Sequence, residues 1–272
     1  MTAVDVHIGP RTFRIDSANH FDLSIPVDFD VRGLSAFGAP PAAVQTVENA
    51  WFVGDTRRGG SCNVKEYRFI PHCHGTHTEC AGHIVDQNLS VTEVLKDAWI
   101  PATLISVEPE KGADCPESYI PGKAEGDALI TRRALVEKLR MLDDEDFHQA
   151  LVIRSLPNSP SKRTRGYVTA PYFSNEAMTE IVREGVEHLL VDVPSVDRME
   201  DEGRLSNHRL FWELPPESHD LNRCKAPSRT ITELIFVADD IRDGYYLLNL
   251  QIAPFRGDAA PSRPLLFPVE VP

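Results

Sequence analysis

Eight short segments of the chain are rich in apolar and β-branched residues and are bounded by polar, glycine or proline positions. Alternation of apolar and polar side chains is typical of half-buried strands, and continuous apolar runs indicate strands that are buried on both faces. The expected strands are 12–15, 64–70, 99–107, 150–153, 189–193, 233–237, 245–252 and 265–271. The pattern therefore predicts an extensive β-sheet.

Two stretches between these strands have apolar residues at helical spacing. Thr131 can cap a helix that runs to Leu139. Ser174 can cap a second helix, which Gly185 would end just before the strand near residue 189. A helix, a glycine and a mostly apolar strand in succession indicate an α/β fold with a buried strand. We therefore predict a mixed α/β architecture.

Length and composition are compatible with one compact domain. The chain has 272 residues, of which 42% are hydrophobic, and it contains no serine-rich linker or internal repeat. Residues 1–272 are expected to form a single domain. The first residues lack the basic and apolar regions of a secretory signal, and no run of eighteen apolar residues predicts a membrane span. Five cysteines without framework spacing suit a reducing cytoplasm.

Charge argues against a nucleic-acid partner. The formal net charge is -13, whereas binding to a phosphate backbone normally requires clustered Lys and Arg. The one short basic segment, 162–165, is expected to be a solvated loop, with a contact to a substrate carboxylate or to another subunit as the alternative. We expect no nucleic acid and no membrane as partners.

Residues 72–83 contain four histidines, two cysteines and one glutamate. Imidazole, thiolate and carboxylate are the groups that bind zinc and similar divalent ions. The ligand types at alternate positions are Cys73, His77, Glu79 and His83. An extended chain would place them on one face but spread them over about 33 Å, so the backbone must bend, and Gly75 and Gly82 are placed to allow it. The segment predicts a metal site that is also an active site.

Other residues of this segment are expected to have structural roles. His72 and His74 would point away from that face, toward structure or solvent. Cys80 is expected to be buried, and Cys73 has the same alternative, because free cysteine often packs as a small hydrophobe. The remaining three cysteines form no C-x-x-C pairs, which argues against a four-cysteine zinc module.

Residues 73–83 resemble the hallmark H-x-G-T-H-x-D-x-P-x-H of the cyclase-like metal-dependent hydrolases, which include bacterial kynurenine formamidase and isatin hydrolase. The Gly-Thr-His centre and the final His are retained, whereas Cys73, Glu79 and Ala81 stand where the family has His, Asp and Pro. Further segments resemble the family in the same order along the chain: 22–26, 191–197, 207–210, 231–234 and 244–264.

The resemblance implies a mixed, partly barrel-like β-sheet flanked by helices, a swivelling β/β/α-type cyclase fold. It also implies one or two divalent ions. Cys73, His77 and Glu79 would hold one ion, and Glu79, His208 and Glu233 would hold the second, with Glu79 as the bridge. His83 would be the catalytic residue that transfers protons. A thiolate at position 73 favours zinc, with manganese as the alternative.

The resemblance implies hydrolysis of a carbon–nitrogen bond in a formamide, amide or cyclic amide, an arylformamidase-like reaction on a small-molecule substrate. It also implies a homodimer or a higher homo-oligomer. Two alternatives stay open: a metal-free scaffold that binds a small molecule, and a Cys73 or Cys80 thiolate nucleophile. Trp51, Phe52 and Phe69 would either line an aromatic pocket or belong to the core.

Overall fold

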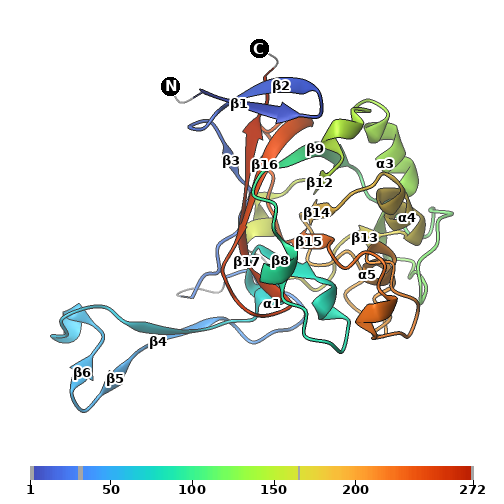
Figure 1. Ribbon diagram of the computed structural model, residues 1–272. Helices are drawn as coiled ribbons and strands as arrows, with labels where there is room; N and C mark the ends of the chain where they lie inside the picture. The colour runs from blue at the N-terminus through green and yellow to red at the C-terminus, as the bar shows by residue number, and fades with distance from the viewer. Residues whose placement is uncertain (1–2, 30–32, 165, 271–272) are drawn as a thin grey trace.

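The centre of the fold is a β-barrel. The structure, a computed structural model, describes residues 3–29, 33–164 and 166–270. Eight strands follow the order β16-β9-β12-β14-β15-β8-β17-β3, and β16 also pairs with β17, so seven of them close into a ring (Figure 1). The barrel strands are β16 (Gly244–Ile252), β9 (Ile100–Val107), β12 (Ala150–Ser155), β14 (His188–Val191), β15 (Thr230–Glu233), β8 (His77–Cys80) and β17 (Ala259–Pro268), with β3 (Phe21–Asp22) beside β17.

Strands β9, β12, β14 and β15 run parallel, and β8, β16 and β17 pair antiparallel with their neighbours. The helices are α1 (Pro71–His74), α2 (Val91–Val94), α3 (Arg132–Leu139), α4 (Asn175–Arg183) and α5 (Ser206–Phe211). Smaller sheets pair β1 (Ala3–Ile8) with β2 (Arg11–Asp16), β4 (Ala43–Thr46) with β7 (Lys65–Arg68), β5 (Glu48–Asn49) with β6 (Phe52–Val53), and β11 (Ala128–Ile130) with both β10 (Glu110–Lys111) and β13 (Tyr172–Phe173). The mixed, barrel-like α/β fold expected from the sequence is confirmed.

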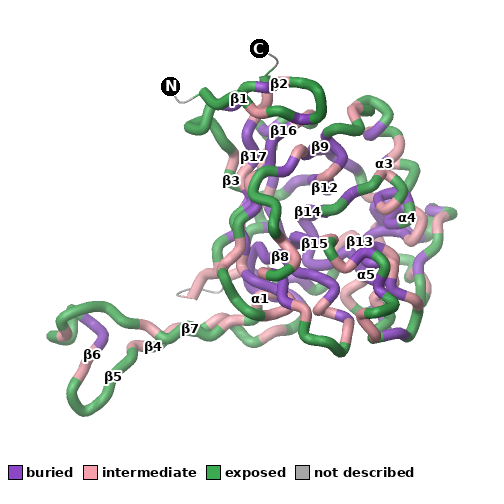
Figure 2. The backbone as a smooth tube through the Cα atoms, in the orientation of Figure 1, coloured by how far each residue is buried: buried purple, intermediate pink, exposed green. Residues whose placement is uncertain are grey.

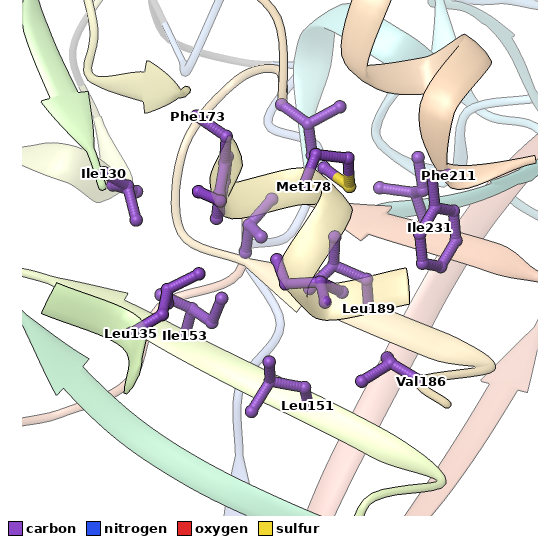
Figure 3. Close-up of a cluster of buried hydrophobic side chains, with 14 of the residues drawn as sticks. Ile130, Leu135, Leu151, Ile153, Phe173, Met178, Val186, Leu189, Phe211 and Ile231 are labelled. Atoms are coloured by element: carbon purple, nitrogen blue, oxygen red, sulfur yellow. The ribbon is translucent and has the colours of Figure 1, made fainter. Parts of the chain in front are cut away.

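The parallel strands are buried on both faces. Along β12, Val152 packs in the barrel interior, whereas Leu151 and Ile153 pack outward against α3 and α4. Figure 3 shows this outer layer, in which Met178 of α4 lies over the sheet. Burying each such side chain contributes about 1.5–3 kcal/mol. The near-continuous apolar runs of these strands follow from this double burial.

Both expected helices form with their predicted caps. The Thr131 hydroxyl accepts a hydrogen bond from the backbone N of Ala134, and Ser174 caps α4 in the same way through Ala177. Gly185, which follows α4, adopts a left-handed φ of 76°. These caps satisfy backbone donors that have no partner within the helix.

Two strand predictions need correction. The segment 233–237 is not a strand, because β15 ends at Glu233 and Leu234 has a φ of 57°, which turns the chain out of the sheet. Its apolar residues are buried as an irregular segment instead. The last strand, β17, begins earlier than expected and ends at Pro268, and Val271 lies outside the described residues.

The basic segment 162–165 is also not a simple solvated loop. Lys162 is buried, and its ammonium lies 2.8 Å from the carboxylate of Asp192 and donates to the carbonyl oxygen of Ser155. A buried ammonium needs such partners because its desolvation is costly. Arg165 lies outside the described residues.

A two-stranded arm, residues 43–68, projects away from the barrel (Figures 1 and 2). Trp51 near its tip is 95% exposed, so it belongs neither to the core nor to a pocket wall. Phe52 is half-buried on the same arm. Phe69, just beyond the arm, packs against Phe29 and Phe255. No helix in the described part of the chain is both long and apolar enough to cross a membrane.

Candidate metal centre

The candidate site is built on β8, which lies between β15 and β17 in the barrel wall. Every residue of β8 is buried. Because side chains alternate along a strand, His77 and Glu79 share one face and Thr78 the other. Glu79 pairs in register with Ile231, which packs against the helical layer, so this face points toward α5. The expected alternation of His77 and Glu79 is present, within a strand of only four residues.

The chain bends on both sides of β8, as the spacing required. Cys73 lies in α1 and His83 ends a 3-10 helix, Ala81–His83. A Cβ atom at Gly82 would lie 2.2 Å from the carbonyl oxygen of Leu89, and one at Gly75 would lie 2.8 Å from that of Ile25. The two glycines therefore permit close approach of neighbouring backbone.

His208 reaches the same place from α5. Its Nε2 lies 3.0 Å from Oε1 of Glu79, and its Nδ1 lies 2.6 Å from the carboxylate of Asp197. Asp197 also accepts hydrogen bonds from the backbone N of Asn207, that of His208 and the Tyr119 hydroxyl. The same carboxylate thus caps the first turn of α5 and fixes the orientation of the imidazole.

Glu233 and His77 meet across the β8–β15 ladder. Their Cα atoms are register partners, and Oε2 of Glu233 lies 3.6 Å from Nε2 of His77. His77 Nδ1 lies 3.1 Å from the carbonyl oxygen of Gly75, to which it donates, and Glu233 accepts from the backbone N of Val196. One polar atom of each side chain is therefore fixed by a backbone group, and a ligand atom of each lies within 4.8 Å of one of Glu79.

A more exposed group borders this buried one. His72 Nε2 lies 3.3 Å from Glu79 and 3.1 Å from Asp258, while His83 Nδ1 lies 3.2 Å from Asp258. The rings of His72 and His83 stack with centroids 4.5 Å apart. His72, His83 and Asp258 retain side-chain exposures of 23%, 29% and 39%, so they form the solvent side of the site.

Electrostatics couple these groups. Burial would raise the pKa of Glu79, but the charges of His83 and His208, a hydrogen bond from His208 and the nearby imidazole of His72 hold it well below its ordinary value. Burial would lower the pKa of His208, yet Glu79 and Asp197 raise it well above the ordinary value. The nearby imidazole of His72 and a hydrogen bond from His83 lower the pKa of Asp258. The carboxylates therefore favour positive charge at the centre of the site.

The donor set fits a divalent ion. Nε2 of His72, Nε2 of His77 and Oε2 of Glu79 are buried and have no hydrogen-bond partner. An unsatisfied buried polar atom is costly, and a bound cation would satisfy all three. Within the described residues, three overlapping groups have ligand atoms that all lie within 4.8 Å: His77, Glu79 and Glu233; Glu79, His83 and His208; and His72, His83 and Asp258. Glu79 belongs to two of them.

Five of the six site residues predicted from the sequence come together here: His77, Glu79, His83, His208 and Glu233. Cys73 does not join them, because its thiol belongs to none of the ligand groups in the described chain. It is buried, and burial together with the charge of Glu233 raises its pKa, which favours the neutral thiol. The resemblance implies that residue 73 is the first metal ligand, whereas the structure places its thiol outside the ligand groups.

His72 is the histidine that enters the site instead, against the expectation of a structural or solvent role. His74 has the structural role expected: its Nδ1 accepts from the backbone N of Ile70, and its Nε2 contacts the carbonyl oxygen of Pro40. Cys80 is buried as expected, and burial raises its pKa to about 12. Asp197 and Asp258 received no role from the sequence, although both lie in segments that resemble the family.

The fold is shared with solved structures of low sequence identity. A predicted metal-dependent hydrolase from Bacillus stearothermophilus aligns with a TM-score of 0.58 and 14% identity, covering 92% of this chain and 98% of that chain. Isatin hydrolase A from Labrenzia aggregata aligns with a TM-score of 0.61 and 14% identity, covering 93% and 94%. Isatin hydrolase A from Ralstonia solanacearum aligns with a TM-score of 0.56 and 16% identity, covering 92% and 91%.

No curated protein matches the chain closely enough to count as a relative. A family model described as "Putative cyclase" matches residues 21–198, well over half of the chain. This match includes β8 and the segment that ends at Asp197. The chain therefore belongs to the cyclase family.

Proposed function

We propose that this chain is a metal-dependent hydrolase that cleaves a carbon–nitrogen bond in a small-molecule formamide, amide or cyclic amide. One observation carries the proposal. Buried ligand atoms of His72, His77 and Glu79 that lack hydrogen-bond partners converge beside the oriented imidazole of His208. Metal-dependent and isatin hydrolases of the same fold support the reaction class.

His77, Glu79, Glu233 and His208 would hold the ion or ions, and we propose His72 in place of Cys73 as a further ligand. His77 and His208 each donate Nδ1–H to a backbone carbonyl or a carboxylate, which leaves Nε2 free as a ligand atom. A divalent ion bound there lowers the pKa of a coordinated water and polarises the substrate carbonyl. Zinc is the proposed ion, with manganese as the alternative, because imidazole and carboxylate suit both.

His83 would move the protons. Its Nδ1 contacts Asp258, so the carboxylate orients the ring. His83 also lies on the solvent side of the cluster, within reach of an incoming substrate. In this role it takes a proton from the attacking nucleophile and returns it to the leaving nitrogen. Histidine suits the task because its ordinary pKa lies near neutrality.

An aromatic substrate is the more specific part of the proposal. Phe69 precedes His72 by three residues and Phe255 precedes Asp258 by three, and the two rings lie 6.4 Å apart. Phe255 is 45% exposed and can stack on an aryl group at the site entrance. Arylformamides such as N-formylkynurenine and cyclic aryl amides such as isatin are the first candidates.

A homo-oligomer is proposed from the arm, residues 43–68. An isolated two-stranded ribbon is marginally stable in water, and this one exposes Trp51 almost completely. A second copy of the chain would cover it. Light scattering of the wild type and of Trp51→Ser tests this point, because loss of a tryptophan that the second copy would cover should shift the equilibrium toward monomer.

The test of function combines metal analysis with a substrate screen. Protein purified without chelator should contain near-stoichiometric zinc or manganese, and it should hydrolyse members of a panel of formamides, cyclic imides and lactones. A metal-free protein without activity after zinc or manganese is added would favour the alternative of a small-molecule binding scaffold. A cysteine nucleophile is disfavoured by the raised pKa of both Cys73 and Cys80.

A further inference from the structure

A second cluster of ligand-type side chains lies at the opposite end of the parallel strands. His188 is the first residue of β14, and Glu187 precedes it. Asp97 approaches from the segment between α2 and β9. The ligand atoms of these three residues all lie within 4.8 Å of one another. Glu233, by contrast, ends the parallel strand β15, so the two clusters are separated by the length of the barrel wall.

His188 is the buried member of this cluster. It is 2% exposed, and its Nδ1 lies 2.8 Å from the hydroxyl of Thr230. Its Nε2 is buried and has no hydrogen-bond partner, although it lies 3.5 Å from the carboxylate of Asp97. A buried imidazole nitrogen is thus directed at an acidic group without a bond between them.

The two carboxylates are accessible from solvent. Asp97 has a side-chain exposure of 52%, and Glu187 is exposed as well. The amide of Gln149 donates to one oxygen of Glu187 at 3.0 Å, which leaves the other oxygen free. Two carboxylates and one imidazole nitrogen therefore converge on a place that an ion can enter from water.

A cation can satisfy this arrangement. If Nδ1 of His188 donates to the hydroxyl of Thr230, the Nε2 lone pair faces the carboxylate of Asp97, and a cation between them would be bound by both groups. One imidazole and two carboxylates with open water positions are a suitable set for zinc.

We propose that Asp97, Glu187 and His188 form a second divalent-cation site, which would take zinc and is separate from the cluster on β8. Its ligands come from β14 and from the segment that precedes β9, so a bound ion links the starts of these two elements. Both carboxylates of the site are exposed to solvent, which suits a stabilising role. The inference does not rest on the proposed hydrolase activity.

Zinc stoichiometry measured by equilibrium dialysis and elemental analysis tests the site. Asp97→Asn removes one ligand charge at an exposed position, and Asp240→Asn makes the same charge change at an exposed residue outside the cluster. The wild type and Asp240→Asn should bind one more equivalent of zinc than Asp97→Asn, whose affinity for that equivalent should fall at least about 10-fold. Glu187→Gln should behave like Asp97→Asn.

His208→Ala separates the two sites. It should lose zinc from the β8 cluster and keep the equivalent that depends on Asp97, and added zinc should still raise its melting temperature. In the background of His208→Ala, Asp97→Asn should abolish that rise. Equal zinc binding by wild type, Asp97→Asn and Glu187→Gln would overturn the proposal. His188 would then donate Nε2–H toward Asp97 and accept from Thr230.

Discussion

The two ends of the barrel wall carry clusters with the same ingredients and different surroundings. In the cluster beside β8, His208 of α5 is supported by the carboxylate of Asp197, and its ligand nitrogen faces the fully buried Glu79 of β8. At the start of β14, His188 is supported only by the hydroxyl of Thr230 and faces the exposed Asp97.

Burial and support decide what each cluster can do. In the buried cluster water is excluded, so charges interact strongly and the half-exposed His83 can act at its edge. In the exposed cluster solvent screens the carboxylates, so an ion would be held more weakly. The difference indicates chemistry at the first cluster and, at most, stabilisation at the second.

The largest expected effect is that of His208→Ala. Removing a ligand should reduce metal affinity more than about 100-fold, since removing only a ligand's supporting group costs about 10–100-fold. His77→Ala should behave alike. His148→Ala, which removes another buried histidine, is the control for stability. Metal content and turnover measured after dialysis check this prediction. Unchanged metal occupancy in both His208→Ala and His77→Ala would contradict the assignment of these residues as ligands.

His83→Ala should come next. If His83 moves protons and does not hold the ion, turnover should fall about 10²-fold or more, the usual scale for one acid or base group, while metal content stays constant. Asp258→Asn should lower turnover less, because it weakens the orientation of the His83 ring but leaves the imidazole in place. Metal loss as large as in His77→Ala would make His83 a ligand.

Asp197→Asn tests the support behind His208 and should give a smaller effect. Zinc affinity should fall about 10- to 100-fold, because the neutral amide orients the imidazole poorly. Asp201→Asn is the matched control: Asp201 also accepts from backbone N atoms before α5 but does not contact His208. If both variants bind zinc equally, Asp197 acts only as a helix cap.

The sequence could predict those parts of the fold that depend on local patterns. The strands around β12 and β14 follow from continuous apolar runs, and α3 and α4 follow from Thr131 and Ser174 as caps. Helix α5 was not predicted, because it has only six residues and begins after Leu205 in a left-handed conformation. Its cap, Asp197, is not adjacent in the chain. The single-domain organisation stays a prediction.

The candidate site could likewise be predicted only where a local pattern or the resemblance pointed to it. His77 and Glu79 follow the alternation of a strand, and the resemblance implied His208 and Glu233 as ligands. The alternation failed at residues 71–74, because they are helical, and it therefore misplaced His72. Asp258 joins the site only because β17 pairs with β8 and brings Ala259 opposite Glu79. Such nonlocal pairing has no signal in the local pattern.

The smallest effect is expected from Cys73→Ser. This variant tests whether the first metal ligand is Cys73, as the family resemblance implies, or His72, as the structure indicates. If Cys73 were a ligand, serine would bind zinc far more weakly, because a neutral hydroxyl poorly replaces a thiolate. The structure places the thiol outside the ligand groups, so zinc affinity should change less than about threefold, whereas His72→Ala should lower it clearly. The larger imidazole of Cys73→His should instead strain the packing of α1 and lower the melting temperature. Zinc titration and thermal melting of the three variants decide the matter. Weak binding by Cys73→Ser together with wild-type binding by His72→Ala would return the first ligand position to Cys73.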